Sequence, residues 1–226
     1  MKRLILILLT AAMVLSLASC AVSDTETGED KLKIVTTIFP QYDFARAVSA
    51  GAPESVEITM LLPPGSESHD YEPTVADLVL IEECDLFICV GGETDAWVDD
   101  ALEAVGKTEG VLRLIDMVPL LHEDTSLVIE DSHAGHDHHD DEDCDEANDD
   151  HGEYDEHVWT SPRNAAIITD VICKAMCEAE PSLADEFKKS AGEYISKLNA
   201  LWDSFIELSL NRERDTVIFA ERFPFR

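Results

Sequence analysis

The feature that most constrains the fold is an alternation of short apolar runs with helical stretches in the first half of the chain. The apolar runs are rich in β-branched residues and cover residues 32–38, 56–62, 85–90 and 111–115. Stretches that we interpret as helices lie between them, at residues 40–49, 74–82 and 94–105. This order is typical of βαβ units and predicts an α/β fold with a mainly parallel sheet. Right-handed crossovers would place helices on both faces of that sheet.

Two further helices are predicted in the second half of the chain. One begins near Pro162 and ends near Ala179, and the other covers residues 183–210. The apolar residues of the longer helix recur at steps of three and four, and they are Phe187, Ala191, Tyr194, Ile195, Leu198, Leu201, Trp202, Phe205 and Leu208. A helix of this length would extend roughly 40 Å and cross a whole domain. We interpret it as a spine between two lobes; a coiled-coil partner helix is the alternative.

The N-terminus has the pattern of a bacterial lipoprotein signal. Lys2 and Arg3 precede an apolar run that is too short to span a bilayer, and small residues then precede Cys20. We predict a signal peptide at residues 1–19, lipidation of Cys20 and a flexible polar tether at residues 20–31. The protein would then be anchored on the extracytoplasmic face of the cell membrane. A plain secretory signal is the alternative.

The charge of the chain excludes one class of function. The sequence holds 48 acidic and 16 basic residues, a net charge of −32, and such a surface repels nucleic acid and attracts cations. Residues 130–156 are the extreme case, because fourteen of these twenty-seven residues are Asp or Glu and five are His. No core can form from this composition, so we predict a solvated, disordered insert within an N-terminal lobe at residues 32–180.

Two histidines outside the insert lie in segments that predict ordered loops. His69 follows the second apolar run, in a loop stiffened by Pro63, Pro64 and Gly65, at the sheet edge where open α/β proteins bind ligands. His157 lies at the end of the acidic insert, where apolar residues resume, in the run Glu-His-Val-Trp-Thr-Ser-Pro. Neutral imidazoles bind transition metals near pH 7, so the pair indicates a metal site.

Enzyme motifs are missing from the sequence. It contains no H-E-x-x-H, no G-x-S-x-G and no P-loop lysine, and the pair Gly91–Gly92 is typical of a turn that ends a strand. We therefore predict that the protein is not an enzyme. A metallohydrolase, the distant alternative, would need an open metal position with a base nearby.

The two histidine motifs resemble those of the zinc and manganese solute-binding proteins of ABC transporters. The resemblance rests on His-Asp-Tyr-Glu-Pro after a Pro-Pro-Gly turn and on Glu-His-Val-Trp-Thr-Ser-Pro after a His-rich acidic insert, in the same order over residues 32–225. It implies two lobes with parallel sheets joined by a long spine helix, with one metal ion in the cleft. The spine would cover residues 181–211. Residues 212–226 would be the start of a C-terminal lobe in a truncated chain.

The resemblance also implies the metal ligands. His69 and His157 would be the first two, and Glu72 and Glu156 would either orient the imidazoles by hydrogen bonding or remain solvent-exposed. Zinc-type relatives have a further histidine after the spine, at a place where this sequence has Ala220. Glu221 beside it could supply an oxygen ligand, as in manganese-type relatives, or could pair with Arg222. A fourth ligand would come from the second lobe.

The implied ion is Zn²⁺, with Mn²⁺ as the alternative. Zinc is favoured by the histidines of the insert, which are His133, His136, His138, His139 and His151. On a flexible segment these imidazoles would bind several ions weakly and collect metal for the cleft; a solubilising acidic run is the alternative. The implied function is capture of the ion by a monomer for an ABC transporter permease. A surface metal-storage or metal-sensing protein that uses the insert itself is the other hypothesis.

Five cysteines remain besides Cys20, and they are Cys84, Cys89, Cys144, Cys173 and Cys177. None forms a CxxC pair, so no zinc ribbon is predicted. Cys173 and Cys177 stand four positions apart in a predicted helix and could face the same side. A disulfide within one helical turn is geometrically awkward, so two buried thiols are favoured. The pairing of the cysteines stays open at this point.

Overall fold

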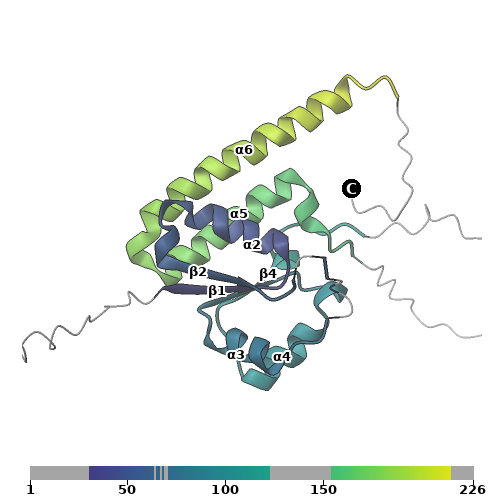
Figure 1. The fold of residues 1–226 in the computed structure, drawn as a ribbon. Coiled ribbons are helices and arrows are strands. Elements are labelled where there is room, and N and C mark those ends of the chain that lie inside the picture. The colour runs from purple at the N-terminus through teal and green to yellow at the C-terminus, as the bar shows by residue number, and fades with distance from the viewer. Residues whose placement is uncertain (1–30, 64, 67, 69–70, 123–153, 215–226) are drawn as a thin grey trace, which may run out of the picture. The chain divides into compact units, whose positions relative to one another are not determined.

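The structure is a computed structural model that describes residues 31–63, 65–66, 68, 71–122 and 154–214 (Figure 1). The chain divides into two units, residues 1–31 and 32–226, and every described helix and strand belongs to the second. The predicted signal peptide, Cys20 and most of the tether and of the acidic insert lie outside the described residues. So does most of the predicted start of a C-terminal lobe, at residues 215–226.

The core of the lobe is a four-stranded parallel sheet. Its strands are β1 (Leu32–Thr36), β2 (Val56–Met60), β3 (Leu86–Cys89) and β4 (Val111–Arg113), and their order across the sheet is β2-β1-β3-β4. Every neighbouring pair is parallel. All four residues of β3 are buried, as expected for a strand covered on both faces. The predicted parallel sheet is confirmed.

Helices cover both faces of this sheet (Figure 1). The helices on one face are α2 (Phe39–Val48), α5 (Pro162–Ala179) and α6 (Ala184–Leu210), and those on the other are α3 (Val75–Glu83) and α4 (Trp97–Val105). Each layer has its own apolar cluster: Ile34, Ile168 and Phe187 belong to the first, and Val35 and Phe87 to the second. Adjacent residues of β1 thus point to opposite faces, as a pleated strand requires.

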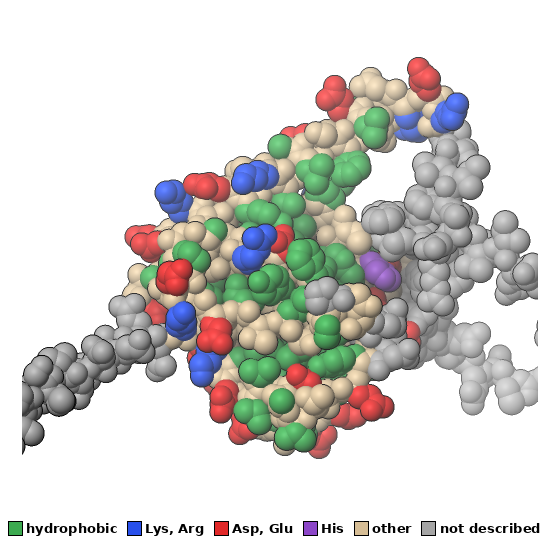
Figure 2. Space-filling view, in the orientation of Figure 1, with side chains coloured by type: hydrophobic (Ala, Val, Ile, Leu, Met, Phe, Trp, Pro, Cys, Tyr) green, Lys and Arg blue, Asp and Glu red, His purple; other side chains and the backbone are tan. Residues whose placement is uncertain are grey.

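The long predicted helix is present as α6, with 27 residues. Its first half packs on α5, where Phe187 and Ala191 are buried. Figure 2 shows hydrophobic side chains gathered along the side of α6 that is turned toward the rest of the described lobe. The second half also carries apolar side chains that stay exposed in the described structure, and these are Leu201, Phe205, Ile206, Leu208 and Leu210. Within the described ranges no helix is long and apolar enough to cross a bilayer.

Candidate metal centre

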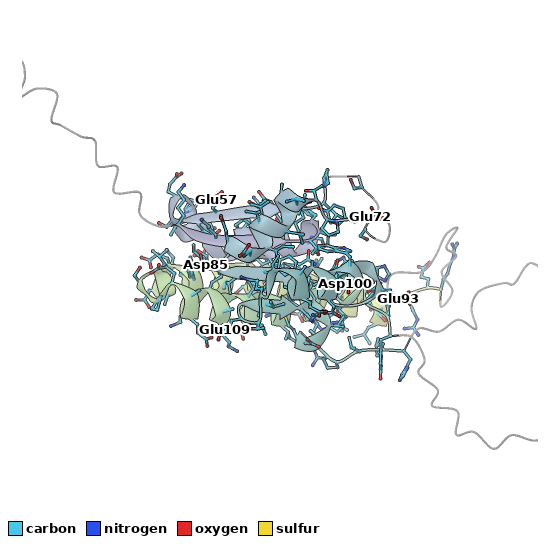
Figure 3. The ribbon with its side chains drawn as sticks, turned by 90° about the horizontal axis from the view of Figure 1, so that it is seen from below. Glu57, Glu72, Asp85, Glu93, Asp100 and Glu109 are labelled. Atoms are coloured by element: carbon cyan, nitrogen blue, oxygen red, sulfur yellow. The ribbon has the colours of Figure 1, made fainter. Side chains whose placement is uncertain are left out.

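The order of the strands creates a topological switch point at one edge of the sheet. β1 and β3 are neighbours, but β1 leads into α2 on one face, whereas β3 leads through a short 3₁₀ turn, Glu93–Asp95, into α4 on the other. Such a switch point, at the carboxyl ends of the strands, is where open α/β sheets bind ligands. Figure 3 shows Glu72 and Glu93 toward this end of the sheet, and Asp85 and Glu109 toward the opposite end.

The loop that contains His69 is held to the sheet where it begins. The backbone N–H groups of Leu61 and Leu62 donate to the carbonyl oxygens of Thr36 and Thr37, at 2.9 and 3.1 Å. Gly65 then adopts a φ of 86°, a left-handed conformation that residues with a side chain rarely adopt. The Ser66 N–H donates to the Pro63 carbonyl at 3.0 Å, so the predicted turn is present. His69 itself lies outside the described residues, so its role as a ligand stays a prediction.

The same loop is held again where it ends, through Tyr71. The Tyr71 hydroxyl donates to Asp77 Oδ2 at 2.9 Å, and its ring lies 5.1 Å from the Trp97 ring, centroid to centroid. Burial, strengthened by the Asp77 carboxylate, raises the pKa of Tyr71, which therefore stays protonated and remains a donor. Asp77 also accepts from the backbone and hydroxyl of Thr74, both at 2.7 Å, which completes a capping box with the N-cap residue Thr74 of α3. His69 lies between two anchored ends.

The second predicted ligand, His157, is oriented by its neighbour Asp155. Asp155 Oδ1 lies 2.9 Å from His157 Nδ1 and accepts from the His157 backbone N–H at 3.0 Å. A ring nitrogen beside a carboxylate carries the proton, so Nδ1 is the donor and Nε2 keeps its free lone pair. The His157 side chain is 42% exposed, against 15% for Asp155. The arrangement therefore presents the imidazole of His157 to solvent from a half-buried carboxylate support.

The backbone on both sides of His157 is also fixed. Asp155 N–H donates to the Leu121 carbonyl at 2.9 Å, and His122 pairs with Tyr154 in an isolated antiparallel bridge. On the other side, Thr160 Oγ1 donates to the His157 carbonyl at 2.8 Å. Tyr154 and Asp155, which the sequence analysis included in the acidic insert, thus have defined contacts. These contacts hold Leu121 and His122 beside Tyr154 and Asp155.

Glu156 extends to the turn that follows β3. A Cβ atom on Gly92 would lie only 2.0 Å from Glu156 Oε2, so the carboxyl group fits there only because residue 92 is glycine. The segment that contains His157 is thereby placed against the turn between β3 and α4, at the switch point. Of the two glutamates expected beside the metal, Glu156 is half-buried here and Glu72 is exposed.

A buried carboxyl group, Asp95, joins the ends of β1 and β3 at the same switch point. Only 3% of Asp95 is exposed, and its Oδ2 accepts from Thr37 Oγ1 at 3.2 Å and from the Val90 backbone N–H. Its other oxygen has no hydrogen-bond partner within the described structure. Burial raises the pKa of Asp95, opposed by these hydrogen bonds and reinforced by the nearby charge of Glu156. Asp95 therefore ties together the two turns that follow β1 and β3.

Among the residues described, no three His, Cys, Asp or Glu side chains lie close enough to hold a metal. His157 is the one predicted ligand that the structure describes. Glu221 and the five histidines predicted as an auxiliary site lie outside the described residues, as His69 does. Their assignment stays a prediction.

Sequence reasoning did not find Asp155 or Asp95. Asp155 is the last aspartate of a long acidic run, and its position two residues before His157 was the only signal that set it apart. Asp95 lies in a segment predicted as regular helix, whereas the structure has a 3₁₀ turn there before α4 begins at Trp97. Its contacts with Thr37 and Val90 depend on strand order, which no local pattern reveals.

The fold and site define a class of protein: an α/β lobe that presents a supported histidine at the switch point of its sheet and extends into a long helix. The chain belongs to the ZnuA family, described as the zinc-uptake complex component A, periplasmic, whose model matches residues 34–224.

Several relatives are similar over most of this chain. The zinc-binding lipoprotein AdcA of Streptococcus pneumoniae is 30% identical over 209 residues, which are 92% of this chain and 38% of that protein. The high-affinity zinc uptake system protein ZnuA of Bacillus subtilis is 28% identical over 203 residues, 84% of this chain and 57% of that protein. The crystal structure of Zn(II)-bound AdcA from S. pneumoniae superposes with a TM-score of 0.59 at 26% identity, covering 78% of this chain and 32% of that one. This chain therefore spans less than two thirds of the length of these relatives.

Proposed function

We propose that this chain belongs to an extracytoplasmic receptor that captures zinc and delivers it to the permease of an ABC transporter. The observation that carries the proposal is the Asp155–His157 pair, which leaves His157 Nε2 free at the switch point of the sheet. The anchored loop of His69 leaves the same edge. His69 and His157 are the first two ligands of the captured ion.

Zinc is the proposed ion because imidazole nitrogen suits it and because the similar proteins are described as zinc-binding or zinc-uptake proteins. Manganese would require more oxygen ligands, of which Glu221 is the candidate. A receptor holds and releases its ion without turnover, so the protein is not an enzyme. It acts as a monomer on the outer side of the membrane, held there by a lipid on Cys20.

The test is a zinc titration of the full chain against a competing chelator, in parallel with His69→Ala and His157→Ala. Each substitution removes a ligand, so each should weaken binding at the tightest site by more than the roughly 10–100-fold that loss of a ligand's hydrogen-bond partner causes. His122→Ala is the matched control, since it removes a described histidine outside the proposed ligand set and should leave the tight site unchanged. Unchanged tight binding in both variants would refute the cleft site and favour storage on the insert.

A further inference from the structure

A pair of thiols lies on α5 away from the proposed zinc site. Cys173 Sγ and Cys177 Sγ are 4.0 Å apart, on successive turns of the helix. Cys173 is buried and Cys177 is half-buried, and neither is part of a disulfide. Twelve residues of helix separate Cys173 from Ser161, which corresponds to roughly 18 Å along the axis. The pair is therefore a separate cluster of metal-ligating groups.

A disulfide between these two sulfurs is disfavoured by the helix itself. Residues four positions apart on an α-helix have Cβ atoms about 5–6 Å apart, whereas a disulfide requires about 3.5–4.5 Å. The observed 4.0 Å between the sulfurs is about twice the length of an S–S bond. Formation of the S–S bond would thus require α5 to distort. An ion that bridges the two sulfurs would not require this distortion.

The sulfur separation matches two thiolates that share one metal ion. If each sulfur lies about 2.3 Å from a common ion, a separation of 4.0 Å corresponds to an S–metal–S angle of about 120°. Shorter metal–sulfur bonds would open the angle further toward a linear geometry. A modest change in the rotamers of Cys173 and Cys177 would therefore let both sulfurs bind the same ion.

The number of ligands decides which ion fits. Structural zinc requires four ligands, but no third His, Cys, Asp or Glu of the described residues joins this pair in a metal-binding group. Soft thiolates select monovalent copper, which two sulfurs satisfy. We propose that Cys173 and Cys177 bind one soft monovalent cation of the copper(I) class, as a two-coordinate bis-thiolate.

The surroundings balance the charge of that complex. Binding replaces two S–H bonds by two S–metal bonds and releases two protons to solvent, which leaves a net charge of −1 on the complex. Lys188 of α6 is close enough to act electrostatically on Cys173 and to compensate that charge, while Asp170 opposes it. Burial raises the pKa of Cys173 to about 12, so the metal must displace the proton. Cys177, half-buried, gives the ion access from solvent.

The experiment measures protection of Cys177 from alkylation. The full chain is incubated with increasing silver(I), which has the same charge and thiolate preference and does not change oxidation state. It is then treated with iodoacetamide, and modification of Cys177 is quantified by peptide mass spectrometry. Cys173→Ala and Cys173→Ser should each raise the silver concentration that gives half-protection by about 100-fold, because the second thiolate ligates intramolecularly. Circular dichroism establishes that both variants are folded.

Cys84→Ser is the matched control, because Cys84 is a buried thiol of the other apolar cluster. It should leave half-protection of Cys177 unchanged. Equal half-protection in the wild type and in both Cys173 variants would overturn the proposal. The outcome of this experiment does not depend on zinc binding by His157, because only the alkylation of Cys177 is measured.

Discussion

At the scale of single residues, the proposed zinc site depends on how the His157 imidazole is supported. Asp155 Oδ1 contacts both the ring and the backbone N–H of His157, so it fixes the tautomer and the direction of the ring together. Such a carboxylate raises the basicity of the opposite nitrogen and removes the entropy that a free ring would lose on binding. Asp155 is therefore expected to matter for affinity without touching the ion.

We predict that Asp155→Ala weakens zinc binding by about 10–100-fold. Asp155→Asn should weaken it less, because its amide oxygen can still accept the Nδ1 proton. The measurement is competition with a chelator at fixed pH. Nitrogen-15 NMR of the metal-free protein should show the Nδ1–H tautomer of His157 in the wild type and a mixture in Asp155→Ala. Equal affinities and tautomers in the wild type and Asp155→Ala would rule out this role.

A second prediction concerns Gly92, whose missing side chain makes room for Glu156. In Gly92→Ala the new Cβ would lie 2.0 Å from Glu156 Oε2, so the segment of His157 must shift. We expect unfolding to become easier by about 1–3 kcal/mol, as in other overpacked sites, with weaker zinc binding. Chemical denaturation and zinc titration measure the two effects.

The matched control is Gly192→Ala in α6, where no atom lies within 4 Å of the added Cβ. This exposed helical position should gain about 0.5–1 kcal/mol of stability, since alanine loses less backbone entropy than glycine. If Gly92→Ala reduced neither stability nor zinc affinity, as expected for Gly192→Ala, the contact between Glu156 and Gly92 would not be as close as described.

At the scale of elements, Asp95 joins the turns after β1 and β3, and its protonation should affect the stability of the lobe. Because burial raises the pKa of Asp95 in the folded protein, protonation favours the folded state. Its stabilising contribution is complete below the unfolded value near 3.8 and is lost as the pH rises through the raised folded value.

We therefore predict that the stability of the wild type relative to Asp95→Asn decreases as the pH rises from about 4 toward 7. The asparagine does not titrate, so the difference between the two proteins isolates Asp95 from the many other acidic groups. Urea denaturation at several pH values gives this difference. A difference that grows with pH would contradict the raised pKa.

The elements also show which features of the fold local sequence patterns can predict. The four strands and the helices on both faces were predicted, since periodicity and capping residues are local signals. Thr74, for example, caps α3, with its hydroxyl accepting from the Asp77 N–H at 3.3 Å. The strand order, the 3₁₀ turn before α4 and the role of Asp95 were not predicted. They arise from contacts between residues far apart in the chain, such as Thr37 with Asp95.

At the scale of the whole molecule, the described lobe positions one proposed ligand, His157, and anchors the loop that contains the other, His69. The motifs of His69 and His157 led to the correct family from sequence, because both depend on short, specific runs of residues. The proposed convergence of the two histidines on one ion depends instead on the switch point between β1 and β3, which no local pattern reveals. The proposed receptor function therefore requires one zinc ion that contacts both rings.

The most direct measurement is anomalous X-ray diffraction at the zinc absorption edge, from crystals of the full chain grown with one equivalent of zinc. The account predicts a single strong peak about 2.0–2.1 Å from Nε2 of His157 and from a ring nitrogen of His69. A zinc peak bound only by histidines of residues 130–156, with none at His157, would contradict it.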